Sequence, residues 1–479
     1  MEQQPFNKSK NIKIVFTGAG AQGDLFGPRV AVELLADEYP DAEVNFLAPR
    51  KALIGLAGKN IIKHNFPSIV DDQLENLDKI GIKKAGNPIY FLSLLQKITS
   101  VFKDDSENGF LSQHKELLKN ATLVGSNTLT FALDHYLIKQ LKKEGFNQDT
   151  KHVFLSTHPV VQKFRKSELM FPVLPFNSIL FWSRFLAINA VTNKFAIFIE
   201  RAMMGGNYKK LKRISGSNNK IVVSGKLSEF EETNAHVLLT YPQFLHGDNP
   251  ADWETKIVQH VGYPYAENDT EDPNTDNILN QIAEAKKEKK KVVLISFGSM
   301  SPTNKKEREK MLKKILEIQR LNPEILIIYQ DPNLKDKNEE ARLREEITKE
   351  NSQLLYTTDY LNYWKLLPKL DTMVSHFGIG SLQEAFRAGI PTISLAFISE
   401  QIWTGNLAKM FGIAKKPHYV NKVKAKKLSN IIRDTLADKR LQENALEMKR
   451  RVGKDIEKNG PGRKRLLAAL IDILNEPVK

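Results

Sequence analysis

A glycine-rich turn in the C-terminal part of the chain contains the residue types that bind phosphate. His376 follows a short apolar run that predicts a buried parallel strand, and Gly378 and Gly380 come next. Glycine lets the backbone turn sharply and approach a ligand closely. Ser381, with Glu384 three residues later, has the spacing of a capping box and predicts a helix start with Ser381 as N-cap. Amides at such a start could bind a diphosphate.

A polar pair follows the next predicted strand, 392–396. Glu400 and Gln401 would lie at the carboxyl edge of the same sheet, where they offer acceptors and an amide donor to vicinal hydroxyl groups. By itself this pair is more simply a solvated loop, and the glycine turn by itself is a common structural connection. Together they predict a site for a diphosphate that carries a hydroxyl-rich group.

Alternating strands and helices must position these residues. Strand 12–16, helix 28–37 and strand 43–47 form a right-handed βαβ unit of Rossmann type. The later elements are strands 123–125, 152–156, 292–296, 324–330, 353–356, 371–375 and 392–396, helices 128–143, 305–321, 382–388 and 463–474, and a charged helical segment that ends at 349. The alternation predicts an α/β fold.

The first glycine turn also has the spacing of a dinucleotide fingerprint, with Gly18, Gly20 and Gly23. An NAD site needs an acidic residue at the end of the second strand, where residues 48–50 read Ala-Pro-Arg. The sequence therefore disfavours NAD.

The C-terminal pattern resembles the nucleotide-sugar signature of inverting glycosyltransferases with the GT-B fold, in particular the sterol 3-beta-glucosyltransferases and relatives that glycosylate natural products. The residues that carry this resemblance are His376, Gly378, Gly380, Ser381, Glu384, Gly389-Ile-Pro391, Glu400 and Gln401. Further segments that resemble family motifs are Phe297-Gly-Ser-Met300 (FGSM), Pro250-Ala-Asp-Trp253 with Val261-Gly-Tyr263, and, with one extra residue before the proline, Gly23-Asp-Leu-Phe-Gly-Pro28 (GDVxP).

The resemblance implies two Rossmann-like domains that face each other across a cleft. We expect an acceptor-binding domain at 1–265, a linker at 266–290 and a nucleotide-sugar-binding domain at 291–455. The remaining segment, 456–479, would form a helix that packs back on the first domain.

The same resemblance implies donor-binding roles for the C-terminal motif. His376 would donate to a phosphate or the ribose, Gly380 and Ser381 would offer amides and a hydroxyl group, and Glu384 would bind the ribose. Glu400 and Gln401 would hold sugar hydroxyls. Taken alone, His376 would be read as a capping or buried histidine.

Other donor contacts are expected from two loops. Gly298 and Ser299 would face the donor phosphates or the space between the domains, and Tyr360 or Tyr363 in the loop 357–363 could stack on a uracil ring. No DxD cluster ends a predicted strand, so we expect neither a metal nor a cofactor beyond the UDP-sugar co-substrate.

Two residues compete for the role of general base. In similar enzymes an aspartate at the position of Asp24 acts on the acceptor hydroxyl, although Asp24 could instead be the N-cap of a helix that begins near Pro28. His158 lies in Ser156-Thr-His-Pro159, which resembles a segment of diacylglycerol glycosyltransferases, and would act there or line the acceptor site.

The most apolar segment, 169–200, could supply an acceptor site. Phe176, Phe181 and Trp182 are the expected acceptor-binding residues, and resemblance to lipid-acceptor enzymes favours this role. For most of its aromatic residues, packing in a helical core is the simpler explanation. Together with nearby basic residues, the segment would also suit a helix at a membrane surface.

Charge and composition limit the partners. With 71 Lys and Arg against 56 Asp and Glu, the net charge of +15 favours an anionic partner, or reflects lysine-rich solvated surfaces. No interleaved aromatic and arginine pattern indicates nucleic acid, so loose contact with an acidic membrane is preferred. The absence of cysteine excludes disulfides and thiolate chemistry. A polar N-terminus and the lack of a long apolar stretch predict a cytoplasmic protein, peripheral at most.

Three functions fit these features: an inverting transferase that moves a hexose, expected to be glucose, from a UDP-sugar to a lipophilic hydroxyl; a nucleotide-sugar 2-epimerase; and a binding protein without turnover. An epimerase should carry clustered acids and needs no apolar acceptor site. A protein without turnover would be expected to lose His376 and the pair at 400–401, which this chain has. We therefore expect the transferase.

Overall fold

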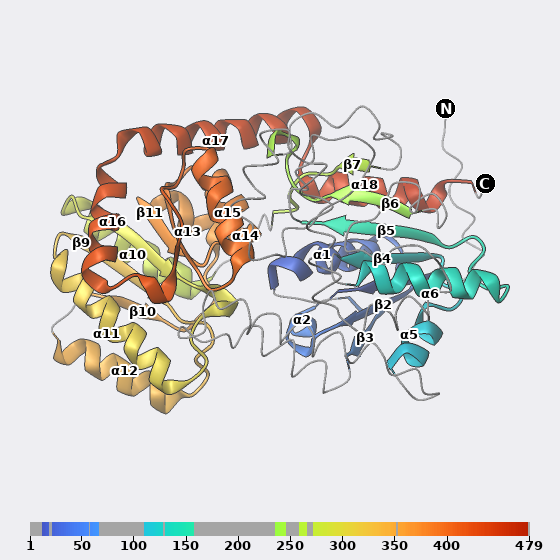
Figure 1. Ribbon diagram of the computed structural model, residues 1–479, viewed down its shortest axis with the longest axis horizontal. Helices are drawn as coiled ribbons and strands as arrows, with labels where there is room; N and C mark the ends of the chain where they lie inside the picture. The colour runs from blue at the N-terminus through green and yellow to red at the C-terminus, as the bar shows by residue number, and fades with distance from the viewer. Residues whose placement is uncertain are drawn as a thin grey trace.

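The computed structural model contains two α/β units that lie side by side (Figure 1). It describes residues 12–18, 22–56, 58–66, 110–127, 130–157, 235–245, 258–265, 272–350 and 353–477. Each unit is built on its own parallel sheet, and both sheets have the strand order of a Rossmann fold. The predicted α/β class is therefore confirmed.

The first unit contains a seven-stranded sheet in the order β3-β2-β1-β4-β5-β6-β7. Its strands are β1 (Lys13–Thr17), β2 (Glu43–Ala48), β3 (Ile61–Asn65), β4 (Leu123–Asn127), β5 (Lys151–Ser156), β6 (Ala235–Leu239) and β7 (Val258–His260). Its helices are α1 (Gln22–Glu38), α2 (Arg50–Leu53), α5 (Phe110–Leu118) and α6 (Phe131–Lys143), with the short 3-10 helix η2 (Gln243–Leu245).

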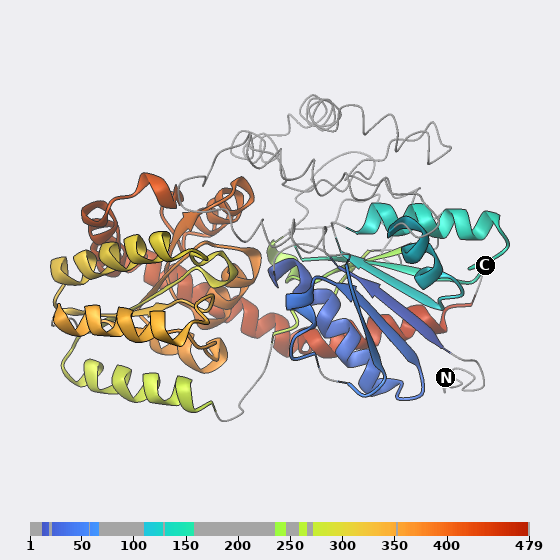
Figure 2. The ribbon, with the colours of Figure 1, turned by 90° about the horizontal axis from the view of Figure 1, so that it is seen from below.

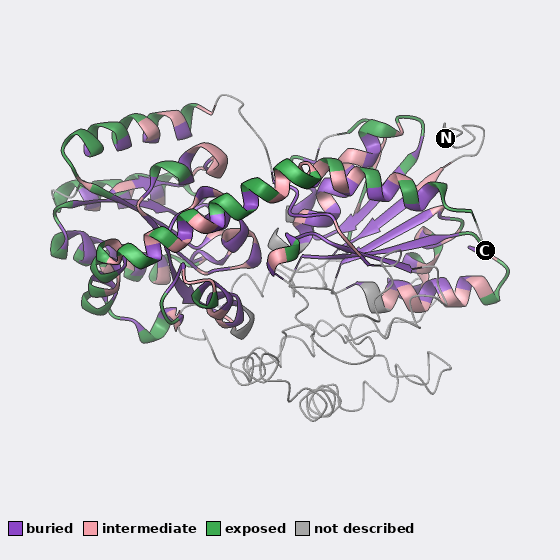
Figure 3. Ribbon diagram, turned by 90° about the horizontal axis from the view of Figure 1, so that it is seen from above, coloured by how far each residue is buried: buried purple, intermediate pink, exposed green. Residues whose placement is uncertain are grey.

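Successive residues of β1 enter different cores, because side chains alternate across a sheet. Ile14 and Phe16 pack on the face covered by α1 and by α18 (Gly462–Asn475). Val15 packs on the opposite face with α5 and α6. Both faces are thus buried, which is why the strands read as continuous apolar runs (Figure 3). Each such buried side chain stabilises the fold by about 1.5–3 kcal/mol.

The second unit contains a six-stranded sheet in the order β10-β9-β8-β11-β12-β13. Its strands are β8 (Lys291–Ser296), β9 (Ile325–Gln330), β10 (Leu355–Thr357), β11 (Thr372–Ser375), β12 (Thr392–Ala396) and β13 (His418–Tyr419). Its helices are α10 (Pro273–Lys287), α11 (Lys305–Leu321), α12 (Lys337–Lys349), α13 (Tyr363–Leu366), α14 (Ile379–Ala388), α15 (Ser399–Met410), α16 (Ala425–Ala437) and α17 (Lys439–Asn459), with 3-10 helices η3 (Gly298–Met300), η4 (Leu367–Lys369) and η5 (Val420–Lys422).

The two faces of the second sheet are also both covered. Val292 and Leu294 belong to a core that includes residues of α10, α14 and α17. Val293 and Ile295 belong to a second core with residues of α11, α12 and α16. The first of these cores continues into the first unit through Tyr263 and Tyr265, so the units share apolar packing.

The end of the chain connects the units a second time. Helix α17 packs on α14, and α18 then packs on α1 and β6 of the first unit (Figures 1 and 2). The expected boundary between 455 and 456 lies inside α17, and the helix break falls at Gly460, whose φ of 83° is left-handed. The expected linker 266–290 contains α10, whose Ile278 and Ile282 are buried in the second unit's core.

Several local expectations need correction. Helix α1 begins at Gln22, not near Pro28, and continues through that proline. Strands β3, β6, β7 and β13 were not expected from the sequence. Within the described ranges, no helix has both the length and the apolar character needed to span a bilayer.

Candidate functional site

The predicted phosphate turn lies at the topological switch point of the second sheet. Strands β8 and β11 are parallel neighbours there, with Ser296 paired to Ser375 at their carboxyl ends. Gly298 follows β8 and His376 follows β11. Open α/β sheets bind ligands at this place, because the chain leaves the two strands in opposite directions.

The His376 imidazole lies between two glycines. A Cβ on Gly298 would lie 3.4 Å from His376 Cε1, and a Cβ on Gly378 would lie 2.9 Å from His376 Nε2. The φ of Gly298 is +51°, so this loop also needs glycine for its backbone conformation. The structure thus brings Gly298 next to the His376–Gly378 turn, which lies about 80 positions later in the sequence.

Phe377 holds the turn in a strained conformation. Its φ is +65°, in the left-handed region that side chains other than glycine avoid, at a cost of about 1–3 kcal/mol. The fully buried Phe377 ring and a hydrogen bond from its N–H to Ser375 Oγ (3.0 Å) stabilise this conformation. Such strain clusters at ligand sites, where it fixes the direction of neighbouring side chains.

Helix α14 starts earlier than predicted. Its N-cap is Gly378, and Ile379 is its first residue, so the expected N-cap role of Ser381 is wrong. The physical reason is tertiary packing: the Ile379 side chain is buried in the core, and this burial favours a helix that begins at Ile379. The amides of Ile379, Gly380 and Ser381 precede the first intrahelical bond, from Leu382 N to Gly378 O, and lie at the positive end of the helix dipole.

Glu384 pairs with Arg387 and does not form the predicted capping box. The Arg387 Nε to Glu384 Oε2 distance is 2.8 Å. Arg387 also donates to the Tyr363 carbonyl (2.9 Å) and lies over the Trp364 ring, 4.2 Å from its centroid. Burial raises the pKa of Glu384, and Arg387 partly offsets this effect. The pair anchors the middle of α14 beneath the phosphate turn.

The pair at 400–401 lies in the first turn of α15 and not in a loop. Gln401 is buried, and its Oε1 accepts hydrogen bonds from the amides of Phe397 (2.7 Å) and Ile398 (3.3 Å). This cap uses the acceptor of Gln401, which leaves its Nε2 as the group able to donate to a sugar hydroxyl. The Glu400 side chain lies outside the described part of the structure.

A buried polar network supports the Gly298 loop. Ser296 Oγ donates to Gln330 Oε1 (2.7 Å), and the Tyr363 hydroxyl contacts both, at 3.0 Å and 2.8 Å. Gln330 Nε2 donates to the Asp359 carbonyl (2.8 Å). The Tyr363 hydroxyl is therefore part of this network, which fixes the direction of its ring.

Tyr360 and Ser299 are held at the rim of the same edge. Tyr360 is 60% exposed, and Lys335 Nζ lies 5.5 Å from its ring centroid. Asn333 Nδ2 donates to the carbonyls of Ser299 (2.9 Å) and Ser301 (2.8 Å), which fixes the loop after Gly298. The ring of Tyr360 is thus more exposed than the half-buried ring of Tyr363.

The acceptor side is described only in part. Asp24 lies in the first turn of α1, so it is not an N-cap of a later helix, and its side chain is outside the described structure. Pro28 has no N–H to donate to the Asp24 carbonyl four residues earlier. The other acceptor-side residues that we expected lie outside the described residues, namely His158, Phe176, Phe181 and Trp182.

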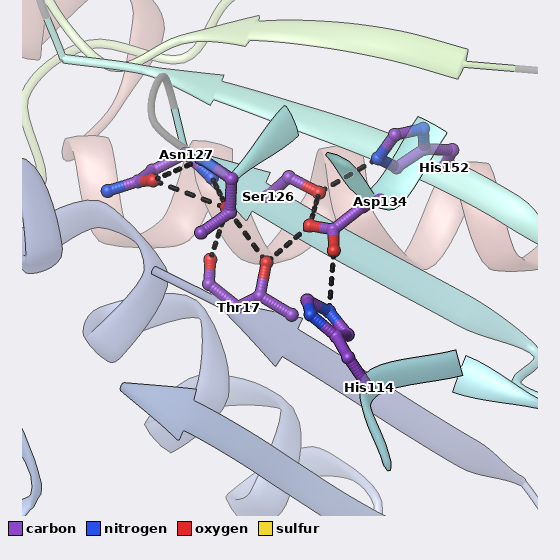
Figure 4. Close-up of polar contacts among 7 residues, drawn as sticks. Thr17, His114, Ser126, Asn127, Asp134 and His152 are labelled. Carbon is purple, nitrogen blue, oxygen red and sulfur yellow. Dashed lines mark hydrogen bonds and ion pairs between the residues drawn. The ribbon is translucent and has the colours of Figure 1, made fainter. Parts of the chain in front are cut away.

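A buried polar cluster in the first unit was missed by sequence reasoning (Figure 4). Asp134 accepts hydrogen bonds from Thr17 and from Ser126 Oγ (2.5 Å), and its Oδ1 lies 2.7 Å from His114 Nε2. Ser126 Oγ also lies 2.8 Å from His152 Nε2. All five residues are buried, so this cluster fastens the ends of β1 and β4 to α5 and α6.

The described residues contain no group of three or more His, Asp or Glu that could hold a metal ion. The polar groups gathered near Gly298, His376 and Gly380 are instead amides, an imidazole and hydroxyls. Their chemistry suits an anion, because each of them can donate a hydrogen bond.

Comparison with known proteins supports the same interpretation. No family model matches the chain. It is 27% identical over 219 residues to the sterol 3-beta-glucosyltransferase of Vanderwaltozyma polyspora, which covers 44% of this chain and 17% of the relative. It is 29% identical over 208 residues to the sterol 3-beta-glucosyltransferase of Komagataella phaffii, which covers 42% of this chain and 15% of the relative. The chain thus spans less than a fifth of the length of these relatives.

Solved structures match over nearly the whole chain. The calicheamicin glycosyltransferase CalG4 has a TM-score of 0.62 at 13% identity and covers 97% of this chain and 98% of its own. The glycotransferase of kitacinnamycin has a TM-score of 0.60 at 14% identity, covering 97% and 99%. LpCGTa in complex with UDP has a TM-score of 0.51 at 12% identity, covering 98% and 100%. These findings confirm the predicted GT-B fold and the resemblance to sterol 3-beta-glucosyltransferases.

Proposed function

We propose that this protein transfers a hexose, in the first instance glucose, from a UDP-sugar to the hydroxyl group of a lipophilic acceptor, with inversion at the anomeric carbon. The observation that carries the proposal is the β11–α14 turn, where His376 lies between Gly298 and Gly378 beside the free amides of a helix. Similarity to enzymes named sterol 3-beta-glucosyltransferase, and to a structure solved with UDP, supports the choice of donor and acceptor class.

The donor half would stabilise the diphosphate as it leaves. The first-turn amides of α14 and the His376 imidazole would donate to phosphate oxygens, and the helix dipole would offset part of the negative charge without a metal ion. Gly298 and Ser299 would leave room for the phosphates. The proposed reaction needs no cofactor besides the UDP-sugar.

The remaining donor residues would hold the two ends of the nucleotide sugar. Glu384 would bind the ribose, and Tyr360 would stack on the uracil ring. Glu400 and the Nε2 of Gln401 would contact sugar hydroxyls. The Arg387 pairing of Glu384 favours this role, because it fixes the direction of the carboxylate and opposes the rise in its pKa that burial causes.

Asp24 is the proposed general base. It would take the proton from the acceptor hydroxyl while the acceptor oxygen forms a bond to the anomeric carbon, and the bond from that carbon to the diphosphate breaks to release UDP. Phe176, Phe181 and Trp182 would bind the apolar part of the acceptor. The position of Asp24 at the carboxyl edge of the first sheet supports this assignment. The net charge of +15 would favour a peripheral contact with an acidic membrane that supplies the acceptor.

His158 provides the alternative acceptor-side residue. It follows the end of β5 by two residues, which is also a carboxyl edge of the first sheet. In that case the acceptor would be a diacylglycerol-type lipid with His158 in its site. Both alternatives use the same donor-binding residues. They differ in whether substitution of Asp24 or of His158 abolishes transfer.

The test is a transfer assay with UDP-glucose and a panel of sterols, diacylglycerol and polyphenols. We expect Asp24→Asn to lower kcat by about 10²–10⁴-fold, and His376→Ala to lower kcat/KM about 10–100-fold. Asp149→Asn, an exposed aspartate in the loop before β5, is the matched control and should behave as wild type.

Several outcomes would contradict parts of the proposal. Wild-type transfer rates in Asp24→Asn would remove it as base, and loss of activity in His158→Ala alone would favour the alternative. Conversion of the UDP-sugar without any acceptor product would indicate an epimerase. Failure of wild type to use any UDP-sugar would contradict the transferase itself.

A further inference from the structure

A tyrosine from the connection between the two units reaches the donor helix. Tyr263 lies in the segment 261–265, which follows β7 of the first unit and precedes α10 of the second. A Cβ on Gly380 would lie 3.2 Å from the Tyr263 hydroxyl oxygen. Because Cα–Cβ bonds tilt toward the N-terminus of a helix, this hydroxyl lies beside the first turn of α14.

The Tyr263 ring is held firmly in this position. It stacks on Phe26 of α1, with ring centroids 5.3 Å apart and an interplanar angle of 17°, and its edge meets Tyr265 at 4.8 Å. Only 6% of the residue is exposed. The hydroxyl therefore cannot swing away from α14 without breaking the stack with Phe26.

The backbone before Tyr263 is fixed by the C-terminal helices. Gly262 has a φ of +70°, and a Cβ there would lie 2.0 Å from the Arg465 guanidinium. Arg465 pairs with Asp455 at 2.6 Å, which ties α18 to α17. A Cβ on Gly462 would lie 2.2 Å from the Tyr263 carbonyl oxygen. The absence of a side chain at Gly262 and Gly462 thus allows α18 to pack against the backbone next to Tyr263.

The Tyr263 hydroxyl has no hydrogen-bond partner within the described ranges, although neighbouring tyrosines do. Tyr265 donates to the Gln383 carbonyl (3.2 Å), and Tyr363 contacts Ser296 and Gln330. Burial and the nearby Glu384 carboxylate raise the pKa of Tyr263, so its hydroxyl remains a donor. The residue is almost wholly buried, and a bound anion at the positive end of the helix could accept a hydrogen bond from this hydroxyl.

We propose that the Tyr263 hydroxyl donates a hydrogen bond to an oxygen of the donor's diphosphate at the N-terminus of α14. The inference rests on the proposed function, because it assigns a further residue to that donor site. It also makes the connection between the units part of the site. The ring stack joins Tyr263 to Phe26, two residues from the proposed base Asp24, so one contact would link the leaving group to the acceptor side.

The test compares UDP and uridine binding in Tyr263→Phe, which keeps the ring and removes the hydroxyl. We expect UDP to bind about 10–100-fold more weakly by isothermal titration calorimetry, as for loss of one hydrogen bond to a charged group. Uridine, which lacks phosphate, should bind Tyr263→Phe as it binds wild type in ligand-observed NMR. Tyr265→Phe is the matched control, since it removes a neighbouring hydroxyl whose partner is a carbonyl, and its UDP affinity should not change.

The outcomes separate this inference from the proposed function. If wild type does not bind UDP, the donor site itself is wrong. If wild type and Tyr263→Phe bind UDP equally, only the role of Tyr263 is wrong. An equal loss of uridine affinity, or an equal loss of UDP affinity in Tyr265→Phe, would show that the connection acts through packing and would overturn the inference.

Discussion

The two units share a strand order but fill their switch points differently. In the first unit, the ends of β1 and β4 are bridged by Asp134 through Thr17 and Ser126, all of them buried. In the second unit, the ends of β8 and β11 carry glycines around the His376 ring. The first switch point is thus bridged by buried protein side chains, whereas the second carries glycines around an imidazole, where we propose that the ligand binds.

This difference shows that topology alone does not define a binding site. The corresponding serines illustrate it: Ser126 donates to Asp134, which also accepts from Thr17 across the first switch point, whereas Ser375 accepts from the amide of Phe377 within its own turn. At the second switch point, the amides of Ile379, Gly380 and Ser381 precede the first intrahelical hydrogen bond of α14, and there we propose that the ligand binds. In the first unit, the proposed base is Asp24 in the first turn of α1, with His158 as the alternative.

The largest expected effect is in the first unit. Asp134→Ala should lower the free energy of unfolding by about 3–5 kcal/mol, because Thr17 and Ser126 lose a buried acceptor and His114 loses the carboxylate 2.7 Å from its Nε2. Urea denaturation followed by circular dichroism measures it, with Asp134→Asn expected to lose less. A stable Asp134→Ala protein without transferase activity would break the comparison, since it would place a functional group at the first switch point.

The next effect concerns the link between the units. Burial lowers the pKa of His260 to about 4, with the Tyr241 carbonyl and Asp455 acting to raise it and Arg465 to lower it. The unfolded chain takes up this proton as the pH falls through 6.5, and the folded protein does not. The contribution of His260 to the free energy of unfolding is therefore fully present above pH 6.5. It is lost as the pH falls toward 4, and the loss is about 3 kcal/mol.

His260→Gln should remove this part of the pH dependence. The measurement is the free energy of unfolding at pH 7 and pH 4.5 for both proteins. The buried His152, whose pKa is also lowered by burial, remains in the variant and contributes in the same direction. Equal acid sensitivity in wild type and His260→Gln would contradict the assignment.

A smaller effect is expected at the second switch point. Gly378→Ala would place a Cβ 2.9 Å from His376 Nε2, so the imidazole must shift, and we expect kcat/KM to fall about tenfold, roughly the value of one hydrogen bond. Gly453→Ala in α17 is the control, because its Cβ would have no neighbour within 4 Å. It should raise stability by about 0.5–1 kcal/mol without changing activity. Unaltered kcat/KM in Gly378→Ala would show that the position of His376 does not matter.

The smallest effect is expected from Tyr363→Phe. The change removes a hydroxyl that contacts Ser296 and Gln330 behind the Gly298 loop, and should lower the free energy of unfolding by about 1 kcal/mol. Fluorescence of Trp364 and Trp403, both in the second unit, can follow urea unfolding. A loss of UDP affinity larger than the loss of stability would mean that Tyr363 contacts the ligand and does not act only by supporting the Gly298 loop.

The sequence predicted the second unit well because its signals are local. Helix α11 and strand β12 have the predicted bounds, since each is a periodic or continuous apolar run with clear ends. Gly389 ends α14 in the left-handed conformation, as its glycine-proline punctuation indicated. His376 and Gly378 were found in the same way, from spacing within one turn.

The remaining features depend on contacts between distant residues. Thr17 and Asp134 are separated by 117 positions, and no local sequence pattern indicates that their side chains form a hydrogen bond. Strand β3 reads Ile-Ile-Lys-His-Asn and lies at a sheet edge. Because three of its five residues are polar, the sequence does not show the apolar run by which the other strands were predicted. The position of Tyr263 beside Gly380 likewise follows from how the units pack, as does the early start of α14.

The most direct test of the central claim is hydrogen–deuterium exchange of the whole protein with and without UDP. If the second switch point binds the diphosphate, UDP should slow exchange in peptides that cover 376–384 and 297–301. Peptides that cover the ends of β1 and β4 in the first unit should not change. Protection of the first switch point instead, with no change at 376–384, would contradict the account.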